Sequence, residues 1–307
     1  MLFTYTKFYN NSIYMKIIDT FMFFDENMML DIRLNILDKY VNKFIICEST
    51  YNHNGETKKL NFDLNLFSKF RSKIVYVVLE KKPENLRKID ENDNEDLKQS
   101  KILDNALIRE NFQRNYVQNE LKKIDEEDLI LVNDLDEIPN LEKFKYKKKI
   151  TIFQQRLQYF KLNLSYPNYL WSGSKICKKK HLISPQWLRN VKTRKYPIWR
   201  PDLLLSNKKY NNIEIIQDGG WHFTNIKSAE EIHHKMTNFL HHYEYQNSGL
   251  NSEDIKKLID GKKALYNYSA DQRENKWKKN PTLIRIELDN LPSYILNNKK
   301  KFESWID

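Results

Sequence analysis

Two aspartates one residue apart follow a short apolar run near the middle of the chain. The run is Leu129–Val132, and Asp134 and Asp136 come next within the segment NDLDEIP, whose proline ends the strand pattern. Residues two apart in an extended segment point to the same side, so the two carboxylates share one face. Such a pair suits a hard cation, Mg²⁺ or Mn²⁺, that bridges diphosphate oxygens. The alternative is an acidic turn that caps the next element.

A glutamate and an arginine lie within the apolar stripe of the helix predicted before that run. The stripe recurs at helical spacing over residues 100–124: Leu103, Leu107, Val117 and Leu121. We expect Arg114 to lean toward the edge of the sheet and to bind phosphate, which a guanidinium group suits. The alternative is a self-contained ion pair, because Glu110 precedes Arg114 by one helical turn.

A third motif, DGGWHF, begins at Asp218 and includes His222. Its two glycines permit a close approach of the backbone to a ligand, and Asp218 and His222 are candidate acid–base or ligand groups. A histidine beside aromatic residues is also compatible with a packed core position. The glycine turn and the nearby acid favour a functional role.

Short apolar runs alternate with helical patterns in the first half of the chain. The predicted strands are residues 16–24, 43–48, 74–79 and 128–133, and the predicted helices are residues 26–40, 64–70 and 100–124. Longer or antiparallel strands are expected over residues 150–164 and 169–172, a further strand over residues 213–216, and a helix over residues 228–245. This alternation predicts a largely parallel α/β sheet, which binds ligands at the carboxyl ends of its strands. Glu48 and Ser49 follow such an end.

The chain of 307 residues carries a formal net charge of +11, which favours anionic partners. Residues 175–200 interleave Trp187, Tyr196 and Trp199 with basic residues, a pattern that can stack nucleic-acid bases. The sequence contains no recognisable nucleic-acid-binding motif, so no specific nucleic-acid partner is expected. A lysine-rich solvated surface is the simpler interpretation of the charge.

The compartment is constrained by cysteines and by hydropathy. Cys47 and Cys177 match no metal-site spacing and no disulfide framework. No apolar run approaches the roughly 20 residues that span a bilayer. We therefore expect a cytoplasmic or soluble protein without a transmembrane anchor.

Taken together, the motifs resemble glycosyltransferase family 17, which includes the β-1,4-mannosyl-glycoprotein 4-β-N-acetylglucosaminyltransferases. The resemblance covers about residues 15–245, and its pieces are Phe21–Phe24, Phe44–Ser49, the helix of Arg114, Asp134–Pro139 and Asp218–His222. Lys235 also falls where the family tends to have a lysine.

The resemblance implies a GT-A-type fold, a Rossmann-like mixed sheet flanked by helices. It places this domain at residues 15–245, after an N-terminal extension of residues 1–14 and before a short, helical, charged tail of residues 246–307. The implied reaction is the inverting transfer of a sugar, N-acetylglucosamine in characterised members, from a UDP-sugar to a glycan hydroxyl. The implied cofactor is Mn²⁺, with Mg²⁺ as the alternative.

Within that reaction each candidate residue has an expected role. Asp136 ligates the metal; Asp134 holds the ribose or a metal-bound water, and His222 binds the metal or phosphate. The donor site is expected to include Glu48, Ser49, Arg114, Asp134, His222 and Lys235. An inverting transfer needs a carboxylate that deprotonates the acceptor, and Asp218 is the first candidate and Glu137 the second. The alternatives are a basic nucleic-acid-binding protein and a catalytically degenerate homologue, and the intact aspartate pair argues against the latter.

Overall fold

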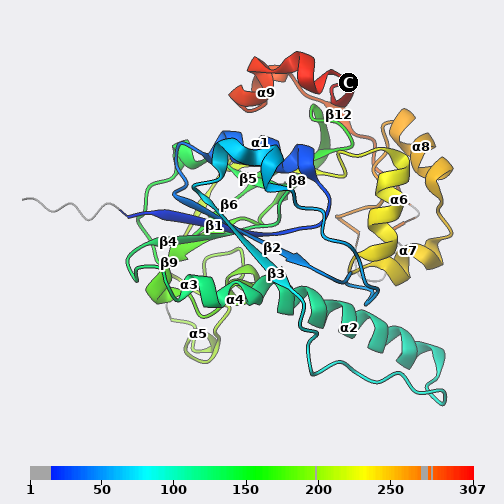
Figure 1. The fold of residues 1–307 in the computed structure, drawn as a ribbon, viewed down its shortest axis with the longest axis horizontal. Coiled ribbons are helices and arrows are strands. Elements are labelled where there is room, and N and C mark those ends of the chain that lie inside the picture. The colour runs from blue at the N-terminus through cyan, green and yellow to red at the C-terminus, as the bar shows by residue number, and fades with distance from the viewer. Residues whose placement is uncertain (1–14, 198, 271–275, 278) are drawn as a thin grey trace, which may run out of the picture.

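The computed structural model describes residues 15–197, 199–270, 276–277 and 279–307. The N-terminal extension expected for residues 1–14 lies outside this described part. Within it, the chain forms two β-sheets with helices packed against them (Figure 1). The predicted α/β class, a mixed sheet flanked by helices, is confirmed.

The larger sheet contains the strands predicted in the first half of the chain. Its described strands are β1 (Ile17–Phe23), β2 (Lys43–Ser49), β3 (Ile74–Leu79), β4 (Leu129–Val132), β6 (Ile150–Phe153), β9 (Lys175–Lys178) and β10 (Ile213–Ile216). Their order is β10-β6-β9-β4-β1-β2-β3. β1 to β4 are parallel, whereas β9 runs antiparallel between β4 and β6. The sheet is therefore mixed, and the acidic motif follows the carboxyl end of a central strand.

Helices cover both faces of the larger sheet. These helices are α1 (Asn27–Leu37) on one face and α2 (Glu95–Tyr116), α3 (Gln118–Leu121) and α4 (Pro185–Asn190) on the other (Figure 1). On β4, Leu129 and Leu131 belong to the apolar cluster of α1, and Ile130 and Val132 belong to the cluster of α3 and α4. Alternate residues of a strand face opposite sides, which explains why all four are apolar.

A smaller sheet carries much of the second half of the chain. Its described strands, in sheet order, are β12 (Ile284–Arg285), β8 (Leu164–Trp171), β7 (Gln155–Tyr159), β11 (Gly220–Thr224) and β5 (Glu137–Pro139). A third apolar cluster joins it to α6 (Ala229–Asn238), α7 (His242–Ser248) and α8 (Ser252–Asp260). The single strand predicted over residues 150–164 is therefore wrong, because β6 and β7 belong to different sheets.

The segment after residue 245, expected as a short, helical, charged tail, contains short helices that pack against the rest of the chain. β12 pairs with β8 of the smaller sheet. α9 (Ser293–Asn297) packs against α1, and Ile295 and Phe302 are buried in the cluster of α1. Apolar side chains spaced among many lysines made this segment look like a charged tail, although enough of them are buried to anchor it.

Helix predictions also need correction: residues 64–70 form a 3₁₀ helix, and residues 228–245 are divided between α6 and α7. The long helix expected over residues 100–124 is divided between α2 and α3, and its stripe is only half buried. Val117 and Leu121 lie in the core, but Leu103 and Leu107 are 38% and 42% exposed because the first half of α2 extends past the sheet (Figure 1). The remaining short elements are α5 (Asp202–Leu205) and 3₁₀ turns at Leu64–Phe70, Leu141–Lys143, Lys179–His181, Leu288–Asn290 and Lys299–Trp305.

Candidate active site

The acidic motif lies where the chain crosses from the larger sheet to the smaller one. β4 ends at Val132 and β5 begins at Glu137, so Asp134 and Asp136 occupy the crossing. A pocket of about 1150 Å³ opens there. Its lining includes these predicted site residues: Arg114, Asp134, Asp136, His222 and Lys235. Four separate segments of the chain thus bring five predicted residues to one cavity.

A buried arginine fixes the backbone of this crossing. Arg33 of α1 donates two hydrogen bonds to the carboxylate of Asp19 on β1, at 2.7 and 2.8 Å. Its Nη1 donates to the carbonyl oxygens of Asp134 and Leu135, both at 3.2 Å, and of Glu137 at 2.6 Å. Burial raises the pKa of Asp19, while Arg33 opposes that shift. Both side chains are fully buried, so the crossing is held from beneath by a satisfied ion pair.

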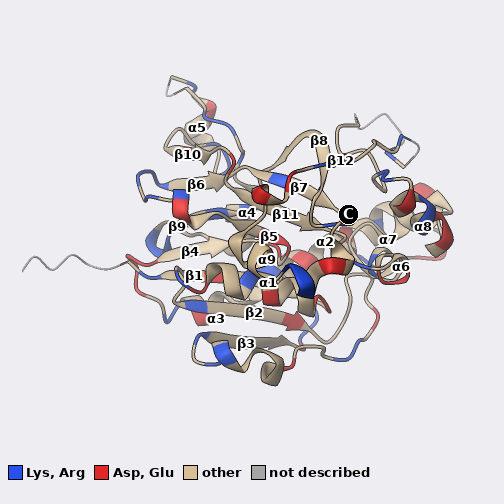
Figure 2. Cartoon of the chain, turned by 90° about the horizontal axis from the view of Figure 1, so that it is seen from above, with Lys and Arg blue, Asp and Glu red and all other residues tan. Residues whose placement is uncertain are grey.

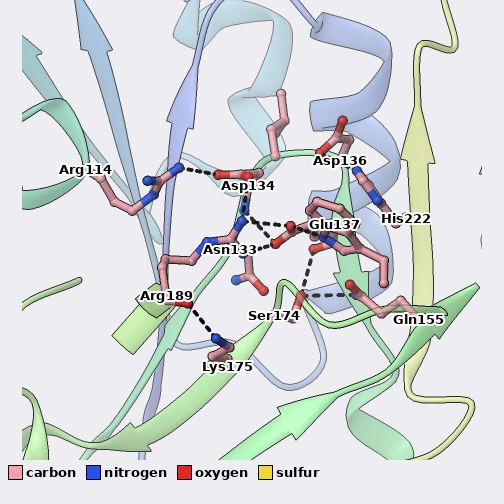
Figure 3. Close-up of polar contacts among 12 residues, drawn as sticks. Arg114, Asn133, Asp134, Asp136, Glu137, Gln155, Ser174, Lys175, Arg189 and His222 are labelled. Carbon is pink, nitrogen blue, oxygen red and sulfur yellow. Dashed lines mark hydrogen bonds and ion pairs between the residues drawn. The ribbon is translucent and has the colours of Figure 1, made fainter. Parts of the chain in front are cut away.

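Asp134 lies between two arginines. Its Oδ1 accepts a hydrogen bond from Arg114 at 2.8 Å and its Oδ2 accepts one from Arg189 at 2.7 Å (Figure 3). Burial raises the pKa of Asp134, but the charges of Arg189 and Arg114 outweigh it and hold that pKa well below its usual range. Because arginines occupy both oxygens, Asp134 fits the role of an arginine anchor better than that of a metal ligand.

Arg114 makes the ion pair of the alternative interpretation and also contacts the acidic motif, while its binding of phosphate stays a prediction. It pairs with Glu110 one turn earlier, at 2.8 Å, and also reaches Asp134. Its Nε is buried and has no hydrogen-bond partner among the described residues. That N–H is therefore unsatisfied in this structure, although the side chain lines the pocket.

Sequence reasoning missed Arg189, which completes the anchor. Ser184 caps the N-terminus of α4 and Pro185 occupies its first turn, so this short helix begins at a fixed point and places Arg189 in its last turn. Lys175 donates to the carbonyl oxygens of Arg189 and Val191 at 2.5 and 2.6 Å, which secures the end of the helix. Burial, with the nearby charge of Arg189, lowers the pKa of Lys175 to about 7. A lone arginine in a basic stretch carries no sequence signal for such a role.

Glu137, the second candidate base, lies under the pocket and is not among its described lining residues. Its carboxylate accepts hydrogen bonds from Arg189 at 2.5 and 3.0 Å and from the indole N–H of Trp171 at 2.5 Å (Figure 3). It also accepts one from the backbone N–H of Asp134 at 2.9 Å. A Cβ at Gly173 would overlap the Glu137 carboxylate and the Trp171 indole. These contacts fit a structural support for Asp134 and not a base that meets substrate.

Asp136 lies beside His222 in the pocket. The Oδ1 of Asp136 lies 3.4 Å from Nε2 of His222, and its Oδ2 lies 3.9 Å from Nζ of Lys235. Burial raises the pKa of Asp136, but His222 and Lys235 outweigh it and lower that pKa. The backbone N–H of Phe223 donates to the carbonyl oxygen of Asp136 at 2.9 Å, which fixes β11 beside the crossing.

The expected metal fits Asp136 and His222 but not Asp134. Among the described residues, no three His, Cys, Asp or Glu side chains are grouped to hold a cation. The contacts around Asp136 are long, at 3.4 and 3.9 Å, so its oxygens are less occupied than those of Asp134. Mg²⁺ is typically bound through one or two carboxylates together with phosphate oxygens and water. The Asp136 carboxylate therefore fits such an ion when a diphosphate supplies most of the rest, and the imidazole of His222 is the weaker candidate ligand.

Lys235 lies between two pocket carboxylates without a short contact to either. Its Nζ is 3.7 Å from Glu26 and 3.9 Å from Asp136. Burial opposes its charge, but Asp136, Glu26 and Asp25 outweigh burial and raise the pKa of Lys235. This ammonium group remains charged and is only loosely paired, which suits a contact with a phosphate.

The structure does not bring Asp218 to this site, which removes the geometric basis for naming it the base. Its carboxylate is 53% exposed and pairs with Lys143 at 2.8 Å and with Arg156 at 3.0 Å. It is not among the described residues that line the pocket. The following Gly220, at φ +133°, approaches the backbone of β5 so closely that a Cβ would overlap the carbonyl of Ile138. The glycine turn therefore serves sheet packing and not a ligand.

Glu48 and Ser49 also lie outside the pocket lining. Glu48 is fully buried and its carboxylate accepts hydrogen bonds from the backbone N–H groups of Asn61 and Phe62, at 2.7 and 3.0 Å. The hydroxyl of Ser49 accepts a hydrogen bond from the N–H of Tyr51 at 3.2 Å. Both residues organise the loop after β2 and do not line the cavity.

That loop contributes the wall that these two residues were expected to form. Its lining residues are Tyr51, Asn52, His53 and Lys58. The amide of Gln113 donates to the carbonyl of Cys47 at 3.1 Å, so its oxygen must accept from Nε2–H of His53, also at 3.1 Å. Burial lowers the pKa of His53, so the ring is neutral and its Nδ1 is an acceptor. Nδ1 of His53 and Oδ1 of Asn52 have no partners among the described residues.

The features that suggested nucleic-acid binding are mostly buried or paired. Trp187 and Tyr196 are only 6% and 7% exposed and offer no stacking platform, whereas Trp199 is 81% exposed, so one of the three aromatic residues is accessible. The lysines at the end of β9 pair with Glu126 and Glu127. Figure 2 shows basic and acidic segments interspersed along the chain. None of the described helices has both the length and the apolar surface to cross a bilayer. Cys47 and Cys177 are buried free thiols.

The sequence model of glycosyltransferase family 17 matches residues 5–306. A search of curated proteins gave no match. Among solved structures, the apo structure of the WbbM bifunctional glycosyltransferase is similar at 10% sequence identity and a TM-score of 0.32. That similarity covers 66% of this chain and 38% of the other, and it is too low to carry an argument. The family match spans nearly the whole chain, and the protein therefore belongs to glycosyltransferase family 17.

Proposed function

We propose that this glycosyltransferase transfers a sugar, N-acetylglucosamine by its family resemblance, from a UDP-sugar to a glycan hydroxyl with inversion. The observation that carries the proposal is the convergence of Arg114, Asp134, Asp136, His222 and Lys235 on one pocket. The cavity has a volume of about 1150 Å³, above the usual range of small-ligand pockets, and lies at the carboxyl ends of β1, β2 and β4, where α/β sheets bind nucleotides.

The donor's parts have matching partners in this pocket. Nδ1 of His53 and Oδ1 of Asn52 are acceptors suited to N–H and O–H donors of a uridine, once the side chains adjust to expose them. Lys235 is the loosely paired cation that meets the diphosphate. Asp136 and His222 would hold a divalent cation, which would neutralise charge that develops on the leaving UDP. Asp134 supports this arrangement by fixing Arg114 and Arg189.

The base must be a carboxylate that lines the pocket, and Glu26 is the one we assign. The other described lining carboxylates are committed: Glu110 to Arg114, Asp134 to two arginines, Asp136 to the cation, and Glu244 to Lys276 and His241. The ion pairs of Glu26 with Lys235 and Lys227 are 3.7 and 4.0 Å long. Both lysines face Oε1, and Oε2 accepts a single hydrogen bond, from the backbone N–H of Asp25 at 3.2 Å, so Oε2 keeps a lone pair for the acceptor's proton.

The deciding experiment is calorimetry of UDP binding with Mn²⁺ and with EDTA. We expect tighter binding with Mn²⁺, and Asp136→Asn should remove the difference. Asp218→Asn is the matched control, because it makes the same change outside the pocket and should keep the difference. Equal affinity of the wild type in both buffers would eliminate the cation. Failure to bind UDP, with tight DNA binding at about 200 mM salt, would favour the nucleic-acid alternative.

A further inference from the structure

The pocket has a second wall, made largely by the C-terminal segment. Three consecutive residues between α8 and β12, Tyr266, Asn267 and Tyr268, line the cavity together with Trp171 of β8. The ring centroids of Tyr266 and Tyr268 are 4.7 Å apart, and the ring centroid of Tyr268 lies 6.1 Å from that of Trp171. The ring centroid of Trp171 in turn lies 4.8 Å from that of His222. An aromatic surface therefore runs from this strap, residues 266–268, to the imidazole beside Asp136.

The strap is held in place before any ligand arrives. The hydroxyl of Tyr166, a buried residue of β8, donates to Oδ1 of Asn267 at 2.9 Å and accepts from the N–H of Tyr268 at 3.0 Å. The hydroxyl of Tyr266 donates to that of Tyr268 at 3.0 Å. These bonds fix the backbone and both rings, so little conformational entropy remains to be lost when a ligand binds.

We propose that this wall is the acceptor subsite and that it binds an uncharged pyranose. The inference rests on the proposed function. Aromatic faces pack against the C–H face of a sugar ring, while phenol and amide groups at their edge hydrogen-bond its hydroxyls. The wall itself carries no charged group, and the nearby Lys276 is paired with Glu244. Among the described residues that line the pocket, Lys235 is the loosely paired cation, and the donor's diphosphate would occupy it, so an acidic sugar would find no unoccupied cation among them.

The position of the wall assigns it to the acceptor and not to the donor. The loop after β2, with Asn52 and His53, supplies the unpartnered groups that suit a nucleoside. The strap belongs to the connection between α8 and β12 of the smaller sheet. Its aromatic surface ends at His222, next to Asp136. A sugar stacked on the strap would therefore present a hydroxyl toward the place where the donor's anomeric carbon lies.

The test compares acceptor and donor binding in variants of the strap. Tyr268→Leu removes a stacking face, and we expect the acceptor KM for neutral p-nitrophenyl pyranosides to rise about tenfold, as for a lost aromatic contact. The Kd for UDP should stay within about twofold of the wild type. Tyr268→Phe restores the ring and should recover most of the acceptor affinity. Thermal melts check that each variant folds. Tyr266→Leu is a second variant, which removes the other aromatic ring of the strap.

Binding to the wild-type chain gives a readout that does not depend on turnover. Saturation-transfer NMR with UDP present should show binding of methyl glucopyranoside and weaker binding of methyl glucuronide. If neither Tyr268→Leu nor Tyr266→Leu weakens pyranoside binding, or if the glucuronide binds better, the inference is wrong. If Tyr268→Leu weakens UDP binding instead, the wall contacts the uracil ring of the donor and not the acceptor. Loss of UDP binding by the wild type itself would refute the proposed function separately.

Discussion

Arg33 donates a hydrogen bond of 2.6 Å from its Nη1 to the backbone carbonyl of Glu137, 104 residues further along the chain. The same guanidinium group is held by Asp19 on β1, so one buried ion pair connects a central strand to the crossing that contains Asp134 and Asp136. The position of Asp134 and Asp136 thus depends on a residue that never enters the pocket.

Replacing Arg33 by Lys should therefore damage the site and the fold together. Lysine keeps the charge but cannot form the bidentate pair with Asp19 and also reach three carbonyl groups. We expect a loss of about 1–3 kcal/mol in unfolding free energy, because buried carbonyl groups lose their hydrogen-bond donor while the charge of the pair is kept. Urea unfolding measures it, with Arg71→Lys, at an exposed arginine, as the control. A loss below about 1 kcal/mol would show that the clamp is dispensable.

Asp134→Asn should destabilise the protein in a pH-dependent way. The substitution leaves Arg114 and Arg189 without their shared carboxylate. We expect the free energy of unfolding to fall by about 2 kcal/mol, less than for a fully buried pair, because 33% of the Asp134 side chain is exposed. The folded-state pKa is depressed, so the contribution is fully present above the unfolded value of about 3.9 and is lost as pH falls through the lower folded value.

Urea unfolding at several pH values measures this effect. The difference in unfolding free energy between wild type and Asp134→Asn should be constant from pH 7 to about pH 5 and shrink only below about pH 4. A difference that already falls between pH 7 and pH 5 would mean that the two arginines do not hold the Asp134 carboxylate as described.

Gly173→Ala should disable the pocket although it adds only a methyl group. The new Cβ would displace the Glu137 carboxylate or the Trp171 indole, and either shift moves Arg189 away from Asp134. We expect UDP affinity to fall at least about tenfold, equivalent to about 1.4 kcal/mol. Gly261→Ala, outside the pocket lining, is the control. Unchanged UDP affinity in Gly173→Ala would show that the network tolerates the displacement.

Glu26→Gln and Asp218→Asn together locate the base. Loss of a general base typically costs ~10²–10⁴-fold in rate. We expect Glu26→Gln to lower transfer by that factor with little change in UDP affinity, while Asp218→Asn stays within about twofold of the wild type. Initial rates with a saturating donor measure both. The opposite pattern would restore Asp218 as the base and would require the turn before β11 to move toward the acceptor.

Several parts of this protein follow from local sequence alone. β3 and β10 have the predicted bounds, and β1, β2 and β4 differ from prediction by one or two residues, because a buried strand needs a short uninterrupted apolar run. Asp134 and Asp136 had to follow a strand end, since NDLDEIP comes directly after four apolar residues. Together with the family motifs, this aspartate pair is enough to indicate a glycosyltransferase from the order of residues along the chain.

Tertiary structure alone decided which side chains complete the site. Arg33, Arg189 and Trp171 contact the crossing from 34 to 104 residues away, and no local period or spacing encodes such contacts. Asp218 precedes the glycine turn as expected, but the backbone of its turn directs it to Lys143 and Arg156 and not to the pocket. Chain pattern determines where an element ends, whereas the direction of a side chain and the identity of its partner depend on how distant elements pack.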